Sequence, residues 1–201
     1  MRVKLAAALA IACLTTTTFL SARGAPPPLA SAPALEDSLS SRGAQAPPPR
    51  KPGAEEKRIE YFAGKWTYTG EAKASPMGPA GKMTGTENCS WAAGGFFLVC
   101  NSEGTGPMGA MKGQSIMGYD PMEKTYTYYA FNSLGTGFFV RGQVADKVWT
   151  WNFENKMEGK VMKGRATITE ESPTAHAFKL EMSVDGGPMA VVEEGKSTKA
   201  K

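Results

Sequence analysis

Histidine and cysteine are scarce in this sequence, with one histidine and three cysteines among 201 residues. A nucleophilic triad needs a base beside its nucleophile, and a structural zinc site needs about four ligands at characteristic spacings. The histidine, His176, stands near the end of an apolar strand face, where we interpret it as a polar cap at the rim of the fold. The sequence therefore predicts no catalytic constellation, no metal site and no cofactor.

Aromatic residues are nearly missing before Ala54, where Phe19 is the single example, although eight of the fourteen prolines lie there. A segment this poor in aromatic side chains buries too little surface to offset the entropy of ordering it. We therefore predict that residues 25–53 form a disordered linker rich in Pro and Ala. One folded domain is expected over residues 54–201.

The first residues are typical of an export signal. Two basic residues precede the apolar stretch Leu5–Leu14, which is shorter than the roughly 20 residues of a membrane-spanning helix. We expect a signal peptide over residues 1–24 and a periplasmic or secreted protein. The alternative is a lipoprotein box ending at Cys13, which would anchor the protein to the outer membrane.

The domain carries no excess of charge. Six Lys or Arg and two Asp or Glu lie before Ala54, whereas seventeen of each follow, so the net charge of +4 belongs to the N-terminal part. Nucleic-acid-binding domains present a basic surface to the phosphates. This balance argues against a nucleic-acid partner.

After a short helical turn expected over residues 54–62, hydrophobicity alternates with a period of two. In 148–154 and 176–184, apolar residues alternate with polar ones, as in strands with one buried face. Nine turn signals rich in Gly, Pro, Asn and Asp separate such segments. Short connections between many strands favour a meander that closes, so we predict an all-β, up-and-down antiparallel barrel of about ten strands, eight to ten in number.

Two motifs resemble those of known families. Phe62–Trp66 holds a Gly-x-Trp motif directly after the expected helical turn, which resembles the opening motif of lipocalins. Gly118–Pro121, followed by Lys124 and Tyr126, resembles the central signature of a bacterial family of exported lipocalin-like barrels, domain of unknown function 1579. The resemblance spans nearly all of residues 58–195; it implies a calycin-type barrel and brings no known activity.

Lipocalins commonly close the barrel by laying an Arg of the last strand over the tryptophan of the opening motif, a cation–π contact. The expected last strand, Met189–Ser197, contains no Arg. Lys196 is therefore the residue expected over Trp66, with a looser closure as the consequence.

The barrel interior is the candidate ligand site. Fatty-acid carriers bind a carboxylate with buried Arg, but Arg141 and Arg165 stand at positions expected to point outward. We therefore expect a small, neutral, hydrophobic ligand. The side chains expected to line the interior are Trp66, Trp91, Leu98, Phe138, Val140, Trp149, Trp151, Phe153, Phe178, Leu180 and Met182.

The alternative is a filled barrel that serves as a non-enzymatic interaction module of the cell envelope. A carrier should hold an apolar cavity of several hundred Å3, on the order of 300–1,000 Å3, whereas an interaction module should expose an apolar patch. The sequence indicates no oligomeric state for either.

Four methionines, Met77, Met83, Met108 and Met111, cluster in segments rich in Gly and Pro. Thioethers bind Cu(I), but copper sites of this type repeat their methionines more tightly. Methionine more often fills or lines apolar space, and we interpret these four in that way.

Cys89 and Cys100 are predicted to form a disulfide. Gly94-Gly95 favours a two-residue hairpin turn, because the primed turns need positive φ. In a hairpin centred on this turn, the numbers of any two opposed residues sum to 189. The numbers of Cys89 and Cys100 have this sum, so the two cysteines are expected to lie opposite each other. Opposed residues lie within the Cα separation that a disulfide accepts, and export supplies an oxidising compartment. The alternative is a longer Ala92–Gly95 loop, which shifts the register and leaves two buried thiols.

Overall fold

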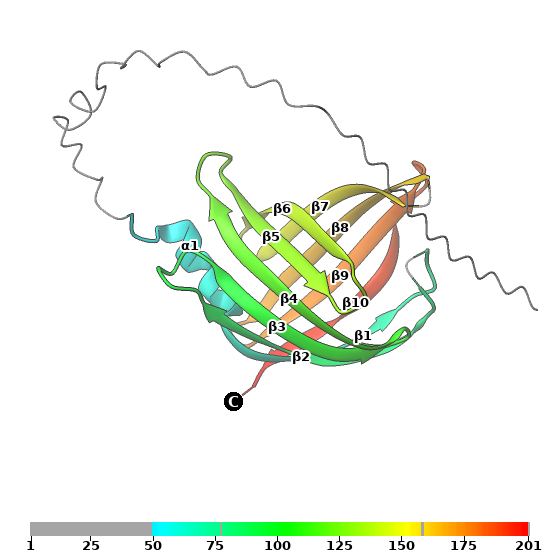
Figure 1. The fold of residues 1–201 in the computed structure, drawn as a ribbon, viewed down its shortest axis with the longest axis horizontal. Helices are drawn as coiled ribbons and strands as arrows, with labels where there is room; N and C mark the ends of the chain where they lie inside the picture. The colour runs from blue at the N-terminus through cyan, green and yellow to red at the C-terminus, as the bar shows by residue number, and fades with distance from the viewer. Residues whose placement is uncertain (1–49, 77, 158, 201) are drawn as a thin grey trace, which may run out of the picture. The chain divides into compact units, whose positions relative to one another are not determined.

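The computed structural model describes residues 50–76, 78–157 and 159–200. The predicted signal peptide, Cys13 and nearly all of the predicted linker lie outside these residues. In Figure 1 the described part forms a barrel of strands with a short helix. Within it, no helix has the length and apolar character needed to cross a membrane.

Ten strands follow the helical segment. α1 (Ala54–Arg58) continues into the 3-10 turn η2 (Ile59–Phe62), as predicted for residues 54–62. The strands are β1 (Gly64–Ala72), β2 (Gly81–Trp91), β3 (Leu98–Gly106), β4 (Gly109–Asp120), β5 (Thr125–Asn132), β6 (Gly137–Ala145), β7 (Val148–Met157), β8 (Lys160–Ser172), β9 (Ala175–Val184) and β10 (Ala190–Lys199). Each strand pairs antiparallel with the next, and β10 pairs with β1 to close the barrel. The predicted up-and-down barrel is confirmed.

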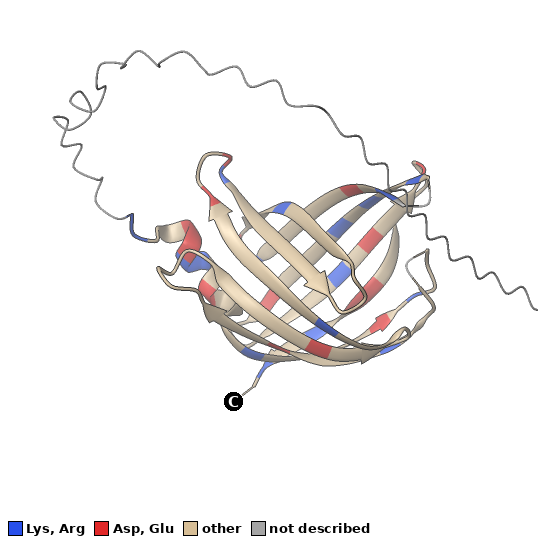
Figure 2. Cartoon of the chain, viewed as in Figure 1, with Lys and Arg blue, Asp and Glu red and all other residues tan. Residues whose placement is uncertain are grey.

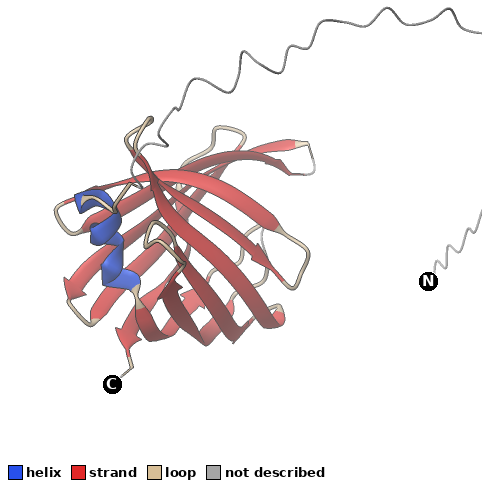
Figure 3. Ribbon diagram, turned by 60° about the vertical axis from the view of Figure 1, so that its left-hand side comes forward, coloured by secondary structure: helices blue, strands red, loops and turns tan. Residues whose placement is uncertain are grey.

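Each of the nine predicted turns overlaps a connection between two strands, although Gly104–Gly109 and Asn155–Gly159 begin within β3 and β7. At two of them an aspartate adopts the left-handed conformation, with φ of 51° at Asp146 in the two-residue connection from β6 to β7 and 49° at Asp185 directly after β9. The connections after β1, β3, β5, β7 and β9 lie at one end of the barrel, which we call the mouth. The other connections lie at the opposite end, where the helix packs (Figure 3), and we call this the sealed end.

The β2–β3 hairpin confirms the predicted disulfide but not the predicted turn. Cys89 lies opposite Cys100 and is bonded to it. The Ala92 N–H donates to the Phe97 carbonyl at 2.8 Å, so the connection spans four residues, 93–96, rather than two. The observed connection is longer than the predicted one by one residue on each side, so its centre is unchanged. The numbers of opposed residues therefore still sum to 189.

The core lies toward the sealed end. Ile59, Leu98 and Trp149 are 0% exposed. Phe62 packs against Trp149 with ring centroids 5.0 Å apart, so the helical segment fills the space between the strand ends. The other buried members of this cluster are Cys89, Cys100, Met117, Tyr126, Val140 and Trp151.

Large aromatic rings lie over glycines on the inner face of the barrel. A Cβ atom at Gly164 would lie 1.9 Å from Cζ of Phe153, and one at Gly142 would lie 2.3 Å from Cε3 of Trp151. Tyr68 covers Gly85 and Gly104 in the same way, and Phe178 covers Gly70 and Gly195. Because these glycines have no side chain, the rings fit inside the barrel, and they fill much of its middle.

Candidate ligand site in the barrel interior

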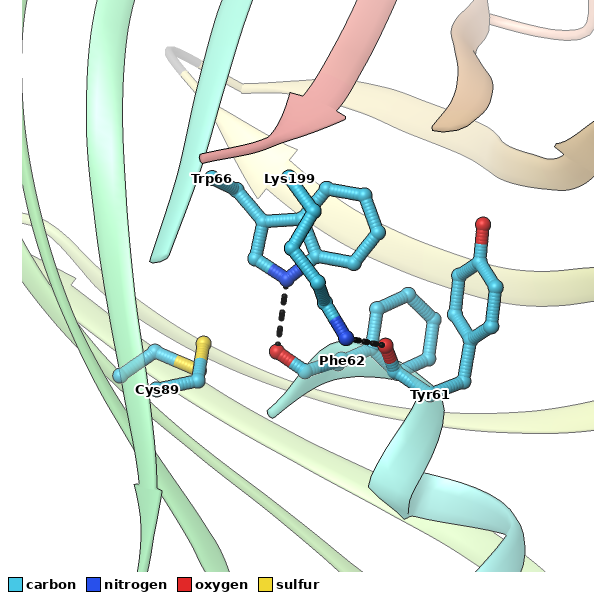
Figure 4. Close-up of a disulfide and its surroundings, with 6 residues drawn as sticks. Tyr61, Phe62, Trp66, Cys89 and Lys199 are labelled. Carbon is cyan, nitrogen blue, oxygen red and sulfur yellow. Dashed lines mark hydrogen bonds between the residues drawn. A yellow bond between two sulfur atoms is a disulfide. The ribbon is translucent and has the colours of Figure 1, made fainter. Parts of the chain in front are cut away.

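Trp66 closes the sealed end. Its Nε1 donates to the Phe62 carbonyl at 2.9 Å, and the Lys199 ammonium lies 4.9 Å from its ring centroid (Figure 4). Lys199 also donates to the Tyr61 carbonyl at 3.2 Å. The Gly-x-Trp motif therefore has the cation–π partner typical of lipocalins, supplied by lysine.

The expectation that Lys196 would cover Trp66 is wrong. β10 continues to Lys199, beyond the predicted end of the last strand, and its register places Lys199 opposite Trp66. Lys196 points to the outer face, where it pairs with Glu171 at 2.9 Å. The error followed from ending the strand too early. Every second residue of β10 points inward, so Lys199 follows Ser197 on the inner face.

His176 lies beneath the seal rather than at an exposed rim. It is 7% exposed, its ring centroid lies 4.7 Å from that of Trp66, and its Nδ1 has no hydrogen-bond partner among the described residues. Burial lowers the pKa of His176 from 6.5 to about 4, although the carboxylates of Glu170 and Glu171 act in the opposite direction. The imidazole is therefore neutral at pH 7 and packs with aromatic rings.

Glu170 joins the helix to the barrel wall. It accepts a hydrogen bond from Nε1 of Trp149 at 2.6 Å and one from Arg58 at 2.5 Å. The Arg58 guanidinium lies 5.1 Å from the Trp149 ring centroid. On the other side of the seal, Trp91 donates to Glu60.

The eleven side chains predicted to line the interior share the inner face, but they are not equivalent. The fully packed ones are Trp66, Leu98, Val140, Trp149, Trp151 and Met182. The partly buried ones are Trp91, Phe153, Phe178 and Leu180. Phe138 stands near the mouth and is 47% exposed. Arg141 and Arg165 lie on the outer face, as expected, where Arg165 pairs with Glu181 at 3.0 Å.

A cavity of about 100 Å3 opens at the mouth. Tyr68 and Glu193 line it, together with three of the four clustered methionines, Met83, Met108 and Met111. Met77 lies outside the described residues. None of the eleven predicted side chains lines this cavity. An apolar cavity of roughly 150 Å3 accommodates benzene, so this one is much smaller than the several hundred Å3 expected of a carrier and holds a group no larger than about one ring.

Two carboxylates that sequence reasoning missed lie on the inner face. Glu87 on β2 stands opposite Trp66 and Ser102, and Glu193 on β10 stands opposite Leu180. Burial raises the pKa of both. Glu87 could have been found from the alternation along β2, because it lies two residues before Cys89 and shares its face.

Two tyrosines bring hydroxyl groups toward these carboxylates. Burial raises the pKa of Tyr128 to about 12, the Glu87 carboxylate adds to the rise, and the nearby Ser115 hydroxyl opposes it. Burial also raises the pKa of Tyr68, with further contributions from Glu87 and Glu193. Tyr68 therefore lies within electrostatic reach of both carboxylates and also lines the mouth cavity.

The Glu87 carboxylate lies within 4.8 Å of the sulfur atoms of Cys89 and Cys100. Three such groups at this spacing can hold a metal ion when the thiols are free. Here the two sulfurs are bonded to each other, so neither offers a thiolate. This group is therefore not a ligand set for a metal in the oxidised protein.

The closed ten-stranded barrel, its Gly-x-Trp strand and the lysine over that tryptophan define a lipocalin-like, calycin-type barrel. The crystal structure of Rv2717c from M. tuberculosis aligns with a TM-score of 0.53 and 11% identity, covering 74% of this chain and 99% of that one. This likeness shows the fold alone. The S-type phycobiliprotein lyase CPES from Guillardia theta aligns with a TM-score of 0.49 and 12% identity, covering 73% and 93% of the two chains. We draw nothing from this weaker alignment.

The chain belongs to the family of proteins of unknown function DUF1579, whose model matches residues 51–199. The match includes the Gly-x-Trp strand and the segment Gly118–Pro121, on which the resemblance was based. In the structure Asp120 accepts hydrogen bonds from the N–H groups of Met122 and Glu123, so it stabilises a turn. No curated protein sequence matches the chain.

Proposed function

We propose that this protein binds a small, largely apolar organic molecule that enters the barrel at the mouth. The observation that carries the proposal is the mouth cavity, which is lined by methionines and by Tyr68 and Glu193. Methionine suits such a lining because it adapts to differently shaped apolar groups. The volume of about 100 Å3 means that a larger ligand must extend out of the mouth or displace side chains.

The charge of the inner face favours a ligand that is not an anion. Glu87 and Glu193 face the interior, and neither forms an ion pair with a Lys or Arg of the described residues. An anionic ligand would meet these two carboxylates, and the lysine that lines the cavity, Lys73, is already paired with Glu71 and Glu194. The sequence-based expectation of a neutral ligand rested only on the lack of an inward-pointing Arg. The two inward carboxylates are a separate reason to expect that the ligand is not an anion.

Titration of the purified protein with N-phenyl-1-naphthylamine and with anilinonaphthalene sulfonate tests the proposal. The first probe is neutral and the second carries a sulfonate. Saturable binding of the neutral probe, with weaker binding of the anionic one, is the expected result. A matched variant, Met83→Glu, places a charge in the cavity wall and should weaken the neutral probe. No saturable binding by a folded protein would overturn the proposal.

A second candidate function is contact with another protein through the outer face of β5 and β6. Phe131 is 50% and Tyr129 48% exposed there, and the Tyr129 ring lies 4.3 Å from that of Phe139. In Figure 2 this hairpin is largely free of charged residues. If the patch binds a second copy, Phe131→Ser should shift the mass measured by light scattering to that of a monomer.

We also propose that the protein is exported, as the first residues predict. The Cys89–Cys100 disulfide supports this, because such bonds persist in oxidising compartments. Mass spectrometry of the mature protein separates cleavage before Ala25 from lipid attachment at Cys13. A full-length cytoplasmic product would contradict both.

A further inference from the structure

The inner and outer carboxylates of the barrel differ in their partners. On the outer face Glu103 pairs with Lys112 at 2.9 Å, and Glu154 pairs with Lys163 at 3.1 Å. Inside, Glu87 has no hydrogen-bond or ion-pair partner among the described residues. Glu87 is only half-buried, but the apolar surroundings disfavour its charged form and raise its pKa, and a cationic partner would offset this cost. The inner face thus holds an acceptor that the protein itself leaves unused.

A second polar group lies beside it. Ser115 on β4 is 5% exposed and faces inward, and its Oγ approaches the Tyr128 hydroxyl without a hydrogen bond of ordinary geometry. The register places Ser115 directly opposite Cys100, and the Glu87 carboxylate lies within 4.8 Å of the Cys100 sulfur. The disulfide therefore brings the carboxylate and the hydroxyl to the same part of the interior.

Tyr128 completes this group. It is on the inner face of β5, where both Glu87 and Ser115 act on its phenol. The site thus contains one carboxylate and two hydroxyl oxygens, all of which accept hydrogen bonds. A primary ammonium group offers three donors and a positive charge, so it matches this set in number and in charge.

Tyr68 connects the mouth cavity to these groups: it lines the cavity, and its hydroxyl lies over Gly85, two residues before Glu87 on the same face of β2. Its phenol responds to the charge of both Glu193 and Glu87. The cations near the two ends of the barrel are already engaged: Lys73 pairs with Glu71 and Glu194, and Lys199 donates to Tyr61. Neither lysine pairs with Glu87, which leaves this carboxylate open to a cationic group of a ligand.

We propose that Glu87, Tyr128 and Ser115, gathered beside the Cys89–Cys100 disulfide, bind the amino group of a small apolar amine whose hydrocarbon part lies toward the mouth cavity. This inference rests on the proposed function, since it names the chemical class of the ligand. Charge-assisted hydrogen bonds inside an apolar barrel are stronger than neutral ones. An alcohol of the same shape would leave the carboxylate without its charge partner.

The test is displacement of N-phenyl-1-naphthylamine from the purified full chain by benzylamine and by benzyl alcohol, which differ only in the donor group. Benzylamine should displace the probe at a concentration at least about tenfold lower than benzyl alcohol. Glu87→Gln should bring the two ligands to within about twofold of each other. The matched control Glu103→Gln, on the outer face, should keep the wild-type preference.

The outcomes separate the two proposals. Saturable probe binding without a preference for benzylamine overturns the amine inference and leaves the proposed function standing. No saturable probe binding overturns both. If Glu87→Gln fails to fold by circular dichroism, Tyr128→Phe and Ser115→Ala replace it. A full tenfold preference in both of these variants would then overturn the assigned site.

Discussion

The two ends of the barrel differ in how their interior is occupied. At the sealed end, rings, a disulfide and the helical segment leave Trp149 and Ile59 0% exposed, and Glu170 satisfies both Trp149 and Arg58. At the mouth, glycines and methionines surround a cavity, and Met108 is 59% exposed. The difference indicates that stability is concentrated at one end, which leaves the other free to admit a ligand.

The largest effect is expected from Trp66→Ala at the sealed end. The substitution removes the ring that Lys199 and His176 pack against and leaves a void, so the free energy of unfolding should fall by about 3–5 kcal/mol. Denaturant titration measures it, with the half-buried Trp91→Ala as the comparison. A loss below about 1 kcal/mol would show that the seal contributes little.

The second-largest effect is expected from low pH, which should destabilise the sealed end. The pKa of His176 is lowered from 6.5 to about 4 in the folded protein, so the unfolded chain binds more protons between these values. Stability therefore falls as the pH drops from about 6.5 to about 4, by at most about 3 kcal/mol. Unfolding of His176→Gln across the same range should show a shallower slope, and equal slopes would contradict the assignment.

Loss of the disulfide should have an intermediate effect. The bridge joins residues 11 apart in sequence, so it constrains only a short loop of the unfolded chain. The double variant Cys89→Ala/Cys100→Ala should lose about 2 kcal/mol, near the low end for disulfides. Denaturant titration of this variant and of the reduced wild type should agree, whereas a loss above about 4 kcal/mol would show that the sulfurs also carry core packing.

The smallest effect is expected at the mouth. A Cβ atom at Gly106 would meet nothing nearer than 3.7 Å, whereas one at Gly164 would lie 1.9 Å from Phe153. Gly106→Ala should change the stability by less than about 0.5 kcal/mol, and Gly164→Ala should cost about 1–3 kcal/mol. Similar costs in thermal denaturation would show that a ring packed over a glycine does not make that position more sensitive than an open one.

The fold could be predicted from the sequence because its determinants are local. Turn residues such as Asp146 and Asp185 mark the ends of strands, and the period of two assigns each side chain to a face. The disulfide register followed from the centre of one hairpin, and it held although the turn was longer than predicted, because the extension was symmetric.

The details of the candidate site could not be predicted in the same way. Whether an inward side chain packs or lines a void depends on which glycines lie across the barrel, and Phe153 over Gly164 is an example of such a pair. Glu87 was missed because a carboxylate was not expected on an inner face, although its spacing from Cys89 shows it. Lys199 was missed because the end of the last strand has no local signal.

The pairing of β1 with β10 has a consequence for biosynthesis. Trp66 meets Lys199, near the C-terminal end of the chain, so the ring of strands cannot close before β10 has been synthesised. Until then β1 presents an unpaired edge, which is a template for pairing with another chain. Contacts this distant in sequence form slowly, because a long segment must be ordered first. The open barrel is therefore exposed to aggregation until β10 pairs with β1.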